Sequence, residues 1–290
     1  MKNIYKLKLA LIGHGISHSQ SPAIFRKAHP NWRYDLLDVD NFDKGYEMFL
    51  NEYDAVNVTA PYKVDAYKRA DIHDTVCEII GASNLLVKED GKIKAYNTDV
   101  LGVFACLRMA IDRISGKKVS DDTDSHVVYQ ADPSVFVDSS KIKVLVIGLG
   151  GAGKAATAAS MMMGFSTTAI NRSFKKTKEF KERLDTGVIT EEVDLANKKS
   201  DNAESRYELK GLTIADMSAS TFSLKKMIAN TDIIIYSLPL ALPELETIDF
   251  TNKIVIEANY HKPTFPEKNC KMYIGGEVWL HAQAHNLLAI

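Results

Sequence analysis

A glycine-rich turn between a predicted strand and a predicted helix is the feature that most constrains this fold. The apolar run KVLVIG, residues 143–148, leads directly into Gly148, Gly150 and Gly153, spaced as G-x-G-x-x-G. The alanine-rich residues 154–160 that follow favour a helix. In such a unit the first glycine makes the tight turn, the second admits a pyrophosphate, and the third lets helix pack on strand. The sequence therefore predicts a Rossmann-type dinucleotide site.

The residues after the next predicted strand favour one dinucleotide over another. Residues 166–170 form that strand, and an NAD-binding protein places an acidic residue after it to hold the ribose hydroxyls. This chain instead has the cationic side chains of Arg172, Lys175 and Lys176, which suit a 2′-phosphate. We therefore predict NADP as the cofactor. The residues expected to hold it are Gly148, Gly150, Gly151, Ala152, Gly153, Asn171, Arg172, Ser173 and Lys176.

The composition excludes several classes of partner. The 290 residues carry a net charge of -1, so neither a nucleic acid nor an anionic membrane is an expected partner. No apolar run approaches the roughly 20 residues that span a bilayer, and residues 1–13 are typical of an entry strand rather than a secretory signal. Three scattered cysteines, Cys77, Cys106 and Cys270, indicate a reducing compartment. We expect a cytoplasmic protein, monomeric or homodimeric, with a small-molecule substrate.

Alternating strands and helices predict an α/β protein of two domains. The first third of the chain is typical of a βαβ-type domain with a mostly parallel sheet. We place this substrate-binding domain at 1–102, completed by a C-terminal helix at 272–290, and a Rossmann-type NADP-binding domain at 103–271, with a cleft between them. A helix over 101–114 links the two. The polar residues 115–141 are predicted to form an inserted loop or hairpin.

Small polar clusters lie at the ends of predicted strands in the first domain, where α/β proteins build their sites. The segment HSQSP offers the hydroxyls of Ser19 and Ser21 before a helix, which suits either a carboxylate or a helix cap. NVTAPYK ends in Lys63, AYNTD ends in Asp99, and Asn84 lies within GASNLL. Taken singly, each cluster is equally compatible with an ordinary cap, turn or surface residue.

Taken in order, these clusters resemble the motifs of the shikimate dehydrogenases. The family's S-x-S-P, N-V-T-x-P-x-K, G-A-x-N and N-T-D motifs appear as SQSP, NVTAPYK, GASN and NTD, and the glycine fingerprint follows as GLGGAG. The NRS segment at 171–173 is similar to the N-R-T/S segment that holds the NADP phosphate in that family. Tyr260 and Gln283 stand where the family has a substrate-facing tyrosine and glutamine. An ordered series of short motifs is far more specific than any one of them.

The resemblance implies a reaction and a set of roles. The family uses NADPH to reduce 3-dehydroshikimate to shikimate, in the chorismate pathway of aromatic amino-acid biosynthesis. By this resemblance Lys63 is the proton donor, and Asp99 hydrogen-bonds beside it. Ser19 and Ser21 would hold the substrate carboxylate. The side chains that would bind ring hydroxyls or position the substrate are Thr59, Asn84, Asp99, Tyr260 and Gln283.

Several positions depart from the family pattern. Leu85 replaces a usual threonine, and Val100 replaces the usual glycine after N-T-D. Tyr236 stands where asparagine is frequent, and Trp279 replaces a methionine near the expected nicotinamide. The chain also stops at Ile290, earlier than the family's last helix usually ends. These departures bear on the cofactor contacts more than on the catalytic pair.

Two other functions stay open at this stage. A quinate/shikimate dehydrogenase also oxidises quinate and often uses NAD, but Arg172 stands where an acidic residue would favour it. A regulatory protein could bind NADP or shikimate without turnover, although Lys63 and Asp99 are retained. No metal is expected, because His281 and His285 lack the acidic neighbour and the third ligand of a hydrolytic zinc site.

Overall fold

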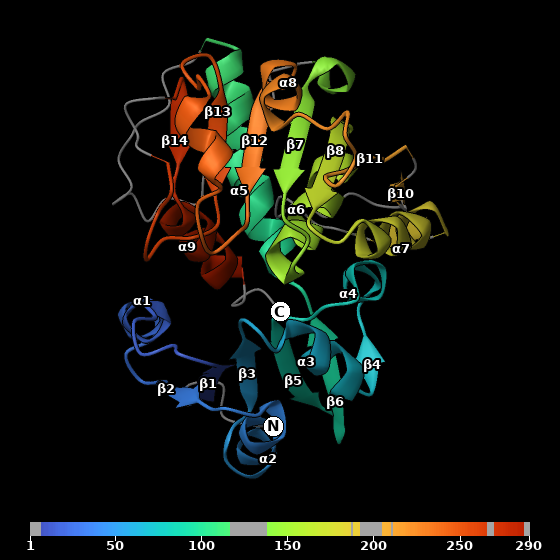
Figure 1. Ribbon diagram of the computed structural model, residues 1–290. Coiled ribbons are helices and arrows are strands. Elements are labelled where there is room, and N and C mark those ends of the chain that lie inside the picture. The colour runs from blue at the N-terminus through green and yellow to red at the C-terminus, as the bar shows by residue number, and fades with distance from the viewer. Residues whose placement is uncertain are drawn as a thin grey trace. The chain divides into compact units, whose positions relative to one another are not determined.

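The chain folds into two compact units, shown in the computed structural model of Figure 1. The structure describes residues 7–116, 138–186, 188–191, 205–209, 211–265 and 270–286. Unit 1 contains the described residues of 7–105 and 277–286, and unit 2 contains the described residues between 106 and 276. Most of the polar stretch at 115–141, where the sequence predicts an inserted loop or hairpin, lies outside the described residues.

Unit 1 is built on a six-stranded sheet in the order β2-β1-β3-β5-β6-β4. Its strands are β1 Lys8–Gly13, β2 Arg33–Asp38, β3 Ala55–Val58, β4 Ile72–His73, β5 Leu85–Glu89 and β6 Lys92–Tyr96. The neighbours β2, β1 and β3 run parallel, and so do β4 and β6. The strand β5 runs antiparallel to β3 and β6. Asp90 and Gly91 both have positive φ, as a tight hairpin turn requires, and this turn reverses the chain between β5 and β6.

The helices of unit 1 follow its strands along the chain. They are α1 Ser21–Ala28, α2 Phe42–Glu52, α3 Lys63–Arg69 and α4 Thr75–Ile80, while α5 Asp99–Ile114 and α9 Gly276–Asn286 each cross a unit boundary. The start of α2 is capped by Asn41, whose Oδ1 accepts from Asp43 N at 2.7 Å. Phe42, Tyr46 and Phe49, spaced by four and three residues, form the buried face of α2.

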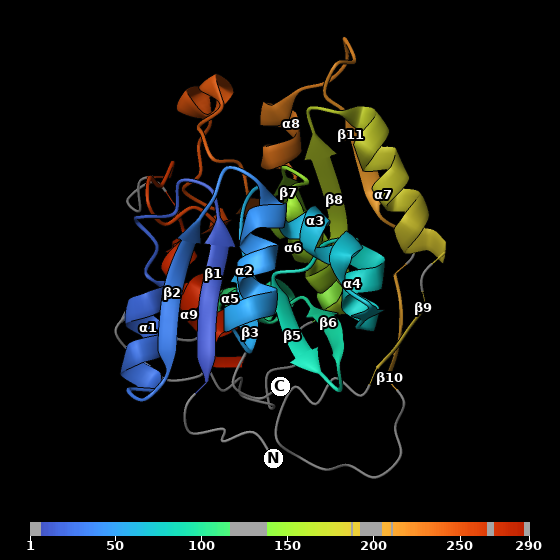
Figure 2. The same cartoon turned by 90° about the horizontal axis from the view of Figure 1, so that it is seen from below.

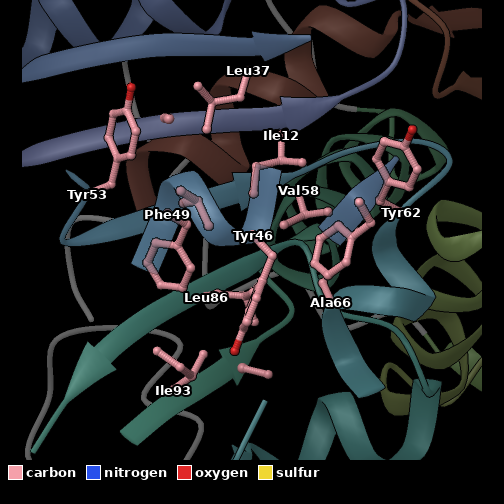
Figure 3. Packing of buried hydrophobic residues seen from close by; sticks show 14 of the residues in the cluster. Ile12, Leu37, Tyr46, Phe49, Tyr53, Val58, Tyr62, Ala66, Leu86 and Ile93 are labelled. Atoms are coloured by element: carbon pink, nitrogen blue, oxygen red, sulfur yellow. The ribbon is translucent and has the colours of Figure 1, made fainter. Parts of the chain in front are cut away.

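The larger core of unit 1 lies between α2 and one face of its sheet, as Figures 2 and 3 show. Figure 3 shows Phe49, which is 0% exposed, within this cluster together with Ile12 of β1. Along β1, Ala10 and Ile12 belong to this cluster, whereas Leu9 and Leu11 belong to a second cluster. Because neighbouring strand residues point to opposite faces, the apolar run of β1 is buried on both sides.

Unit 2 is a Rossmann-type unit. Its large sheet has six strands, β7 Lys143–Ile147, β8 Ser166–Asn171, β11 Thr213–Asp216, β12 Ile233–Tyr236, β13 Ile254–Glu257 and β14 Met272–Ile274. They pair in parallel in the order β11-β8-β7-β12-β13-β14. Counted within this sheet the order is 3-2-1-4-5-6, which is the dinucleotide-binding order, with its switch point between β7 and β12.

The remaining elements of unit 2 lie between these strands along the chain or directly before them. They are α6 Gly151–Met162, α7 Phe174–Thr186, α8 Leu224–Ala229, the 3-10 helices Ser139–Lys141 and Pro243–Thr247, and an antiparallel pair, β9 Val188–Glu191 and β10 Ser205–Glu208. The four residues of β12 are all buried, as expected for a parallel strand covered on both faces. Within the described ranges, no helix combines the length and hydropathy of a membrane span.

The C-terminal helix begins later than predicted. The sequence predicts a helix over 272–290, but Met272–Ile274 form β14 and pair in parallel with β13. The helical prediction is wrong here because Met272 and Ile274 are both buried beside the sheet, and the Tyr273 hydroxyl between them donates to Glu257 Oε2 at 2.9 Å. The helix α9 starts only at Gly276.

Candidate functional site

A buried ion pair between Lys63 and Asp99 is the polar centre of unit 1. Lys63 Nζ donates to Asp99 Oδ2, and only 16% of the lysine side chain and 3% of the aspartate side chain are exposed. Asn84 Nδ2 donates to the other carboxylate oxygen, Asp99 Oδ1, at 3.2 Å. The fold thus joins three residues that the sequence places in three separate motifs, and we call them the Lys63–Asp99–Asn84 cluster.

Local structure fixes each member of this cluster. Lys63 and Asp99 are the first residues of α3 and α5, and a helix N-terminus stabilises the carboxylate charge of Asp99. Asp99 N also donates to Asn97 Oδ1 at 3.2 Å. Asn84 Nδ2 donates to Thr98 Oγ1 at 3.0 Å as well as to Asp99, and Asn84 Oδ1 accepts from Thr98 N at 2.8 Å. Both amide hydrogens of Asn84 are therefore used inside the protein, one by Thr98 and one by Asp99, and its role toward a substrate stays a prediction.

The cluster has the composition of a proton-transfer site. A buried charge is tolerated when it is paired and hydrogen-bonded, and the Lys63–Asp99 pair meets this condition. An ammonium group carries three hydrogens. The bond to Asp99 uses one of them, so Lys63 Nζ can also donate to the oxygen of a ligand.

The two serine hydroxyls predicted to bind a carboxylate lie together at the start of α1. Ser19 Oγ and Ser21 Oγ are 3.3 Å apart, and Ser21 is 7% exposed. Ala23 N and Ile24 N both donate to Gln20 O, so the hydroxyls rather than these N–H groups are available to an anion.

Gln283 on α9 carries a buried side-chain oxygen. Its Oε1 has no hydrogen-bond partner among the described residues. A buried polar atom left unpaired costs about 1–3 kcal/mol, so a ligand hydroxyl would relieve this cost. On the same helix, Trp279 is 4% exposed and packs against Gly102, where a Cβ would lie only 2.6 Å from the indole Cδ1. The Trp279 side chain, which departs from the family's methionine, is therefore buried against α5.

The structure places the other two predicted substrate residues on strand-end segments. Thr59 follows β3 in unit 1, and its N–H donates to Ile12 O at 2.9 Å. Tyr260 follows β13 in unit 2, close to the start of α9, where a Cβ on Gly276 would lie 3.0 Å from Tyr260 N. The roles of both toward a substrate stay predictions.

The glycine turn of unit 2 has the shape that a dinucleotide needs. Gly148 has a φ of +96°, which only glycine adopts readily, and it turns the chain from β7 toward α6. A Cβ on Gly153 would lie 2.0 Å from Gly148 O, so the third glycine lets the helix start against the strand end. A Cβ on Gly150 would meet nothing within 4 Å, so the second glycine borders open space. The first N–H groups of α6, at Gly151, Ala152 and Gly153, offer donors to an anion there.

The end of β8 carries polar and cationic groups rather than a carboxylate. Asn171 is the last residue of β8, and Arg172 follows it with an exposed side chain. Ser173 Oγ accepts from Lys176 N at 3.4 Å at the start of α7, and Lys176 is also exposed. The structure brings these four predicted cofactor residues into one strand-to-helix turn next to the glycine turn, since β7 and β8 are paired neighbours.

Lys154 is a candidate cofactor contact that the fingerprint itself does not single out. Its Nζ lies 5.5 Å from the centre of the Phe180 ring of α7. Lys176 and Arg183, four residues before and three after Phe180, share that face of α7. Burial, and then repulsion from Arg183 and Lys176, lowers the pKa of Lys154. Cations gathered in this way suit an anion, and the available sequence signal is a basic residue directly after the third glycine.

The fold and these sites define a class: a two-unit α/β protein with a Rossmann-type dinucleotide unit and a buried Lys–Asp pair in the other unit. Two family models match the chain. The shikimate dehydrogenase substrate binding domain matches residues 11–86, and the C-terminal domain of alanine dehydrogenase/PNT matches residues 135–241.

Individual proteins of similar sequence or structure carry the name shikimate dehydrogenase. The shikimate dehydrogenase (NADP(+)) of Ignicoccus hospitalis is 33% identical over 184 residues, covering 60% of this chain and 59% of that protein. That of Methanococcus vannielii is 26% identical and covers 91% of this chain and 74% of that protein. The solved shikimate dehydrogenase of Aquifex aeolicus shares the fold, with a TM-score of 0.67, 19% identity and coverage of 99% and 94%.

The chain is similar in sequence to the shikimate dehydrogenases. In the first two curated alignments the matched segment spans 59% and 56% of the relatives' lengths. The activity of the whole protein is therefore a matter for proposal.

Proposed function

We propose that this protein is an NADP-dependent shikimate dehydrogenase, which interconverts 3-dehydroshikimate and shikimate in chorismate and aromatic amino-acid biosynthesis. The observation that carries the proposal is the buried Lys63–Asp99 pair, whose lysine lies within residues 11–86, the segment matched by the shikimate dehydrogenase substrate binding domain. Relatives named as NADP(+)-dependent shikimate dehydrogenases support the same reading.

In this proposal Lys63 and Asp99 are the catalytic residues. A dinucleotide held at the glycine turn would, when bound, provide the hydride chemistry of this reaction. When the ketone is reduced, Lys63 Nζ gives a proton to the ketone oxygen, and in the reverse direction it takes that proton back. Asp99 holds the ammonium group in place, and Asn84 holds the carboxylate through the bond to Oδ1. Low solvent exposure at the pair excludes competing water.

We assign substrate recognition to the hydroxyl and amide side chains that the motif resemblance implies. The paired hydroxyls of Ser19 and Ser21 would donate to the substrate carboxylate. The Oε1 of Gln283, which has no partner in the part of the chain that the structure describes, would accept from a ring hydroxyl, with Thr59 and Tyr260 as further partners. Unit 1 is the proposed substrate domain, with unit boundaries at 105/106 and 276/277, a few residues from those that the sequence predicts.

We assign dinucleotide binding to the glycine turn and to the strand end beside it. Open space at Gly150 and the first N–H groups of α6 fit a pyrophosphate. Arg172, Ser173 and Lys176, with Asn171 beside them, fit a phosphorylated ribose, and the cationic charge there favours NADP over NAD. Three free cysteines in the described residues are compatible with the cytoplasmic location that we propose, and a monomer or homodimer is the proposed assembly.

A rate measurement with four substrate–cofactor pairs tests this function. Purified protein is offered shikimate or quinate, each with NADP or NAD, and cofactor reduction is followed by absorbance. We expect reduction of NADP with shikimate and little with quinate. A preference for NAD or quinate would instead identify a quinate/shikimate dehydrogenase. Tight binding without turnover, measured by calorimetry, would identify a regulatory protein.

A further inference from the structure

Tyr236 ties a loop of unit 2 into a fixed shape. This tyrosine is the last residue of β12, is 0% exposed, and packs edge-on against Phe265 with ring centres 5.1 Å apart. Its hydroxyl donates to Leu240 O at 2.6 Å and accepts from Leu242 N at 3.1 Å. We call residues 237–242 the β12 loop. The buried Tyr236 hydroxyl thus bonds to two backbone groups of this loop, the carbonyl of Leu240 and the N–H of Leu242.

The β12 loop also touches the glycine turn. Ser237 Oγ lies 3.2 Å from Ile147 O and 3.1 Å from Gly148 O, to which it donates. A Cβ on Gly148 would lie 2.7 Å from Leu238 Cδ2, and one on Gly153 would lie 2.6 Å from Ser237 Oγ. The β12 loop therefore packs so closely against the glycine turn that a side chain at Gly148 or Gly153 would clash with it.

The sheet order decides which half of a dinucleotide would meet this loop. The strand β7 lies between β8 and β12. In a Rossmann unit the two mononucleotide halves lie on opposite sides of the switch point, and the ribose contacts at the end of β8 define the adenosine side. The β12 loop is consequently on the nicotinamide side. Leu240 at its tip is 63% exposed, which leaves an apolar side chain free to meet a ring.

We propose that Tyr236 is a positioning residue that holds the β12 loop as a preformed wall for the nicotinamide half of the dinucleotide. Preforming a loop lowers the ordering cost of binding. Burial raises the pKa of Tyr236 to about 12, so the hydroxyl keeps its proton and its bond to Leu240 O over the physiological range. The inference rests on the proposed function for the identity of the dinucleotide.

The test compares two ligands by calorimetry on the purified chain. NADP contains both halves, whereas adenosine 2′,5′-bisphosphate contains only the adenosine half. The variant Tyr236→Phe removes the hydroxyl and keeps the ring against Phe265. We expect the Kd for NADP to rise about tenfold, or about 1.4 kcal/mol, while the Kd for the bisphosphate stays within about twofold of wild type. Tyr273→Phe is the matched control, because the hydroxyl that it removes is also partly buried and donates to Glu257 Oε2.

Each outcome separates the inference from the proposed function. An unchanged Kd for NADP in Tyr236→Phe would overturn the inference, and so would equal weakening of both ligands, which indicates a general loss of structure. Wild-type protein that binds neither ligand would remove both the cofactor assignment and this inference. Wild-type protein that binds NADP but turns over no substrate would overturn the proposed function alone, since the two Kd values would still decide the role of Tyr236.

Discussion

Lys63 and Asp99 form an ion pair in which 84% of the lysine side chain and 97% of the aspartate side chain are removed from solvent, given their exposures of 16% and 3%. The two residues begin different helices and are 36 positions apart in the chain. Asn84, from a third segment, holds the carboxylate by a bond of 3.2 Å. An ion pair that is fixed by these bonds and largely shielded from solvent is suited to transferring a proton to or from a single ligand atom.

Replacing Lys63 by methionine is expected to lower kcat by at least about 100-fold, because a positioned proton donor contributes about 10²–10⁴-fold. The same change leaves Asp99 as a buried charge without its cation, so we expect the free energy of unfolding to fall by on the order of 3 kcal/mol. Steady-state kinetics and urea denaturation measure the two effects separately.

The double variant Lys63→Met/Asp99→Asn is the control for this prediction. Removing both charges leaves no unpaired ion, so we expect most of the stability to return while the activity stays lost. A single variant Lys63→Met that keeps kcat within a fewfold of wild type would contradict the catalytic role.

Two glycines of the turn are expected to respond differently to alanine. Gly150→Ala adds a methyl where no atom lies within 4 Å and at a φ of -70° that alanine adopts, so stability should change by less than about 0.5 kcal/mol. The methyl would occupy the proposed pyrophosphate space, and the Kd for NADP should rise at least about tenfold. Gly153→Ala forces a Cβ to 2.0 Å from Gly148 O and should cost about 1–3 kcal/mol or more of stability. Calorimetry and thermal unfolding check both, and tight NADP binding by Gly150→Ala would refute the assignment of the turn.

Arg172→Ala is expected to weaken NADP binding much more than NAD binding. A hydrogen bond to a charged group contributes about 1.5–3 kcal/mol, so we expect the Kd for NADP to rise about 10- to 100-fold and the Kd for NAD to change little. The measurement is titration calorimetry with each dinucleotide. Lys178→Ala is the control, because Lys178 lies on α7 and its Nζ is 4.0 Å from Glu182 Oε1. Equal losses for both dinucleotides would show that Arg172 does not read the 2′-phosphate.

Lys154→Met is expected to stabilise the fold at neutral pH. The charge of Lys154 is held partly buried and is repelled by Arg183 and Lys176, which lowers its pKa in the folded state. Between this lowered pKa and the unfolded value of about 10.4, the unfolded chain binds more protons than the folded chain. Wild-type stability therefore rises with pH through that window relative to the variant.

The advantage of Lys154→Met should accordingly be largest at neutral pH and shrink as the pH approaches about 10. Urea denaturation of both proteins in steps of pH measures the difference. A variant that is less stable than wild type at neutral pH, or a difference that does not depend on pH, would show that Lys154 is not destabilised by its neighbours.

Local patterns account for most of the fold. The glycine turn, the apolar strands and the helical spacing of Phe42, Tyr46 and Phe49 are properties of short segments, and the structure confirms the mostly parallel sheets that they predict. Two of the elements that the sequence does not predict are very short strands. Ile72–His73 and Met272–Ile274 contain two and three residues, too few to show a period, and they are strands because neighbouring strands pair with them.

For the candidate site, too, the sequence predicts some features and leaves others to the three-dimensional structure. Motifs identify Lys63, Asp99 and Asn84 as polar residues at strand ends, but they do not show that both amide hydrogens of Asn84 are used by Thr98 and Asp99. The lack of a hydrogen-bond partner for Gln283 Oε1 among the described residues also depends on packing that no local pattern encodes. Motifs thus predict which residues take part, while the contacts between distant segments decide how each one acts.

The most direct test of the central claim follows a hydrogen atom from substrate to cofactor. Shikimate deuterated at the carbon that bears the oxidised hydroxyl is incubated with NADP and the wild-type protein, and the dinucleotide is analysed by mass spectrometry. The account predicts NADPH that carries the deuterium together with a ketone product. Unlabelled and unreduced NADP after full incubation would contradict the claim that this protein is a shikimate dehydrogenase.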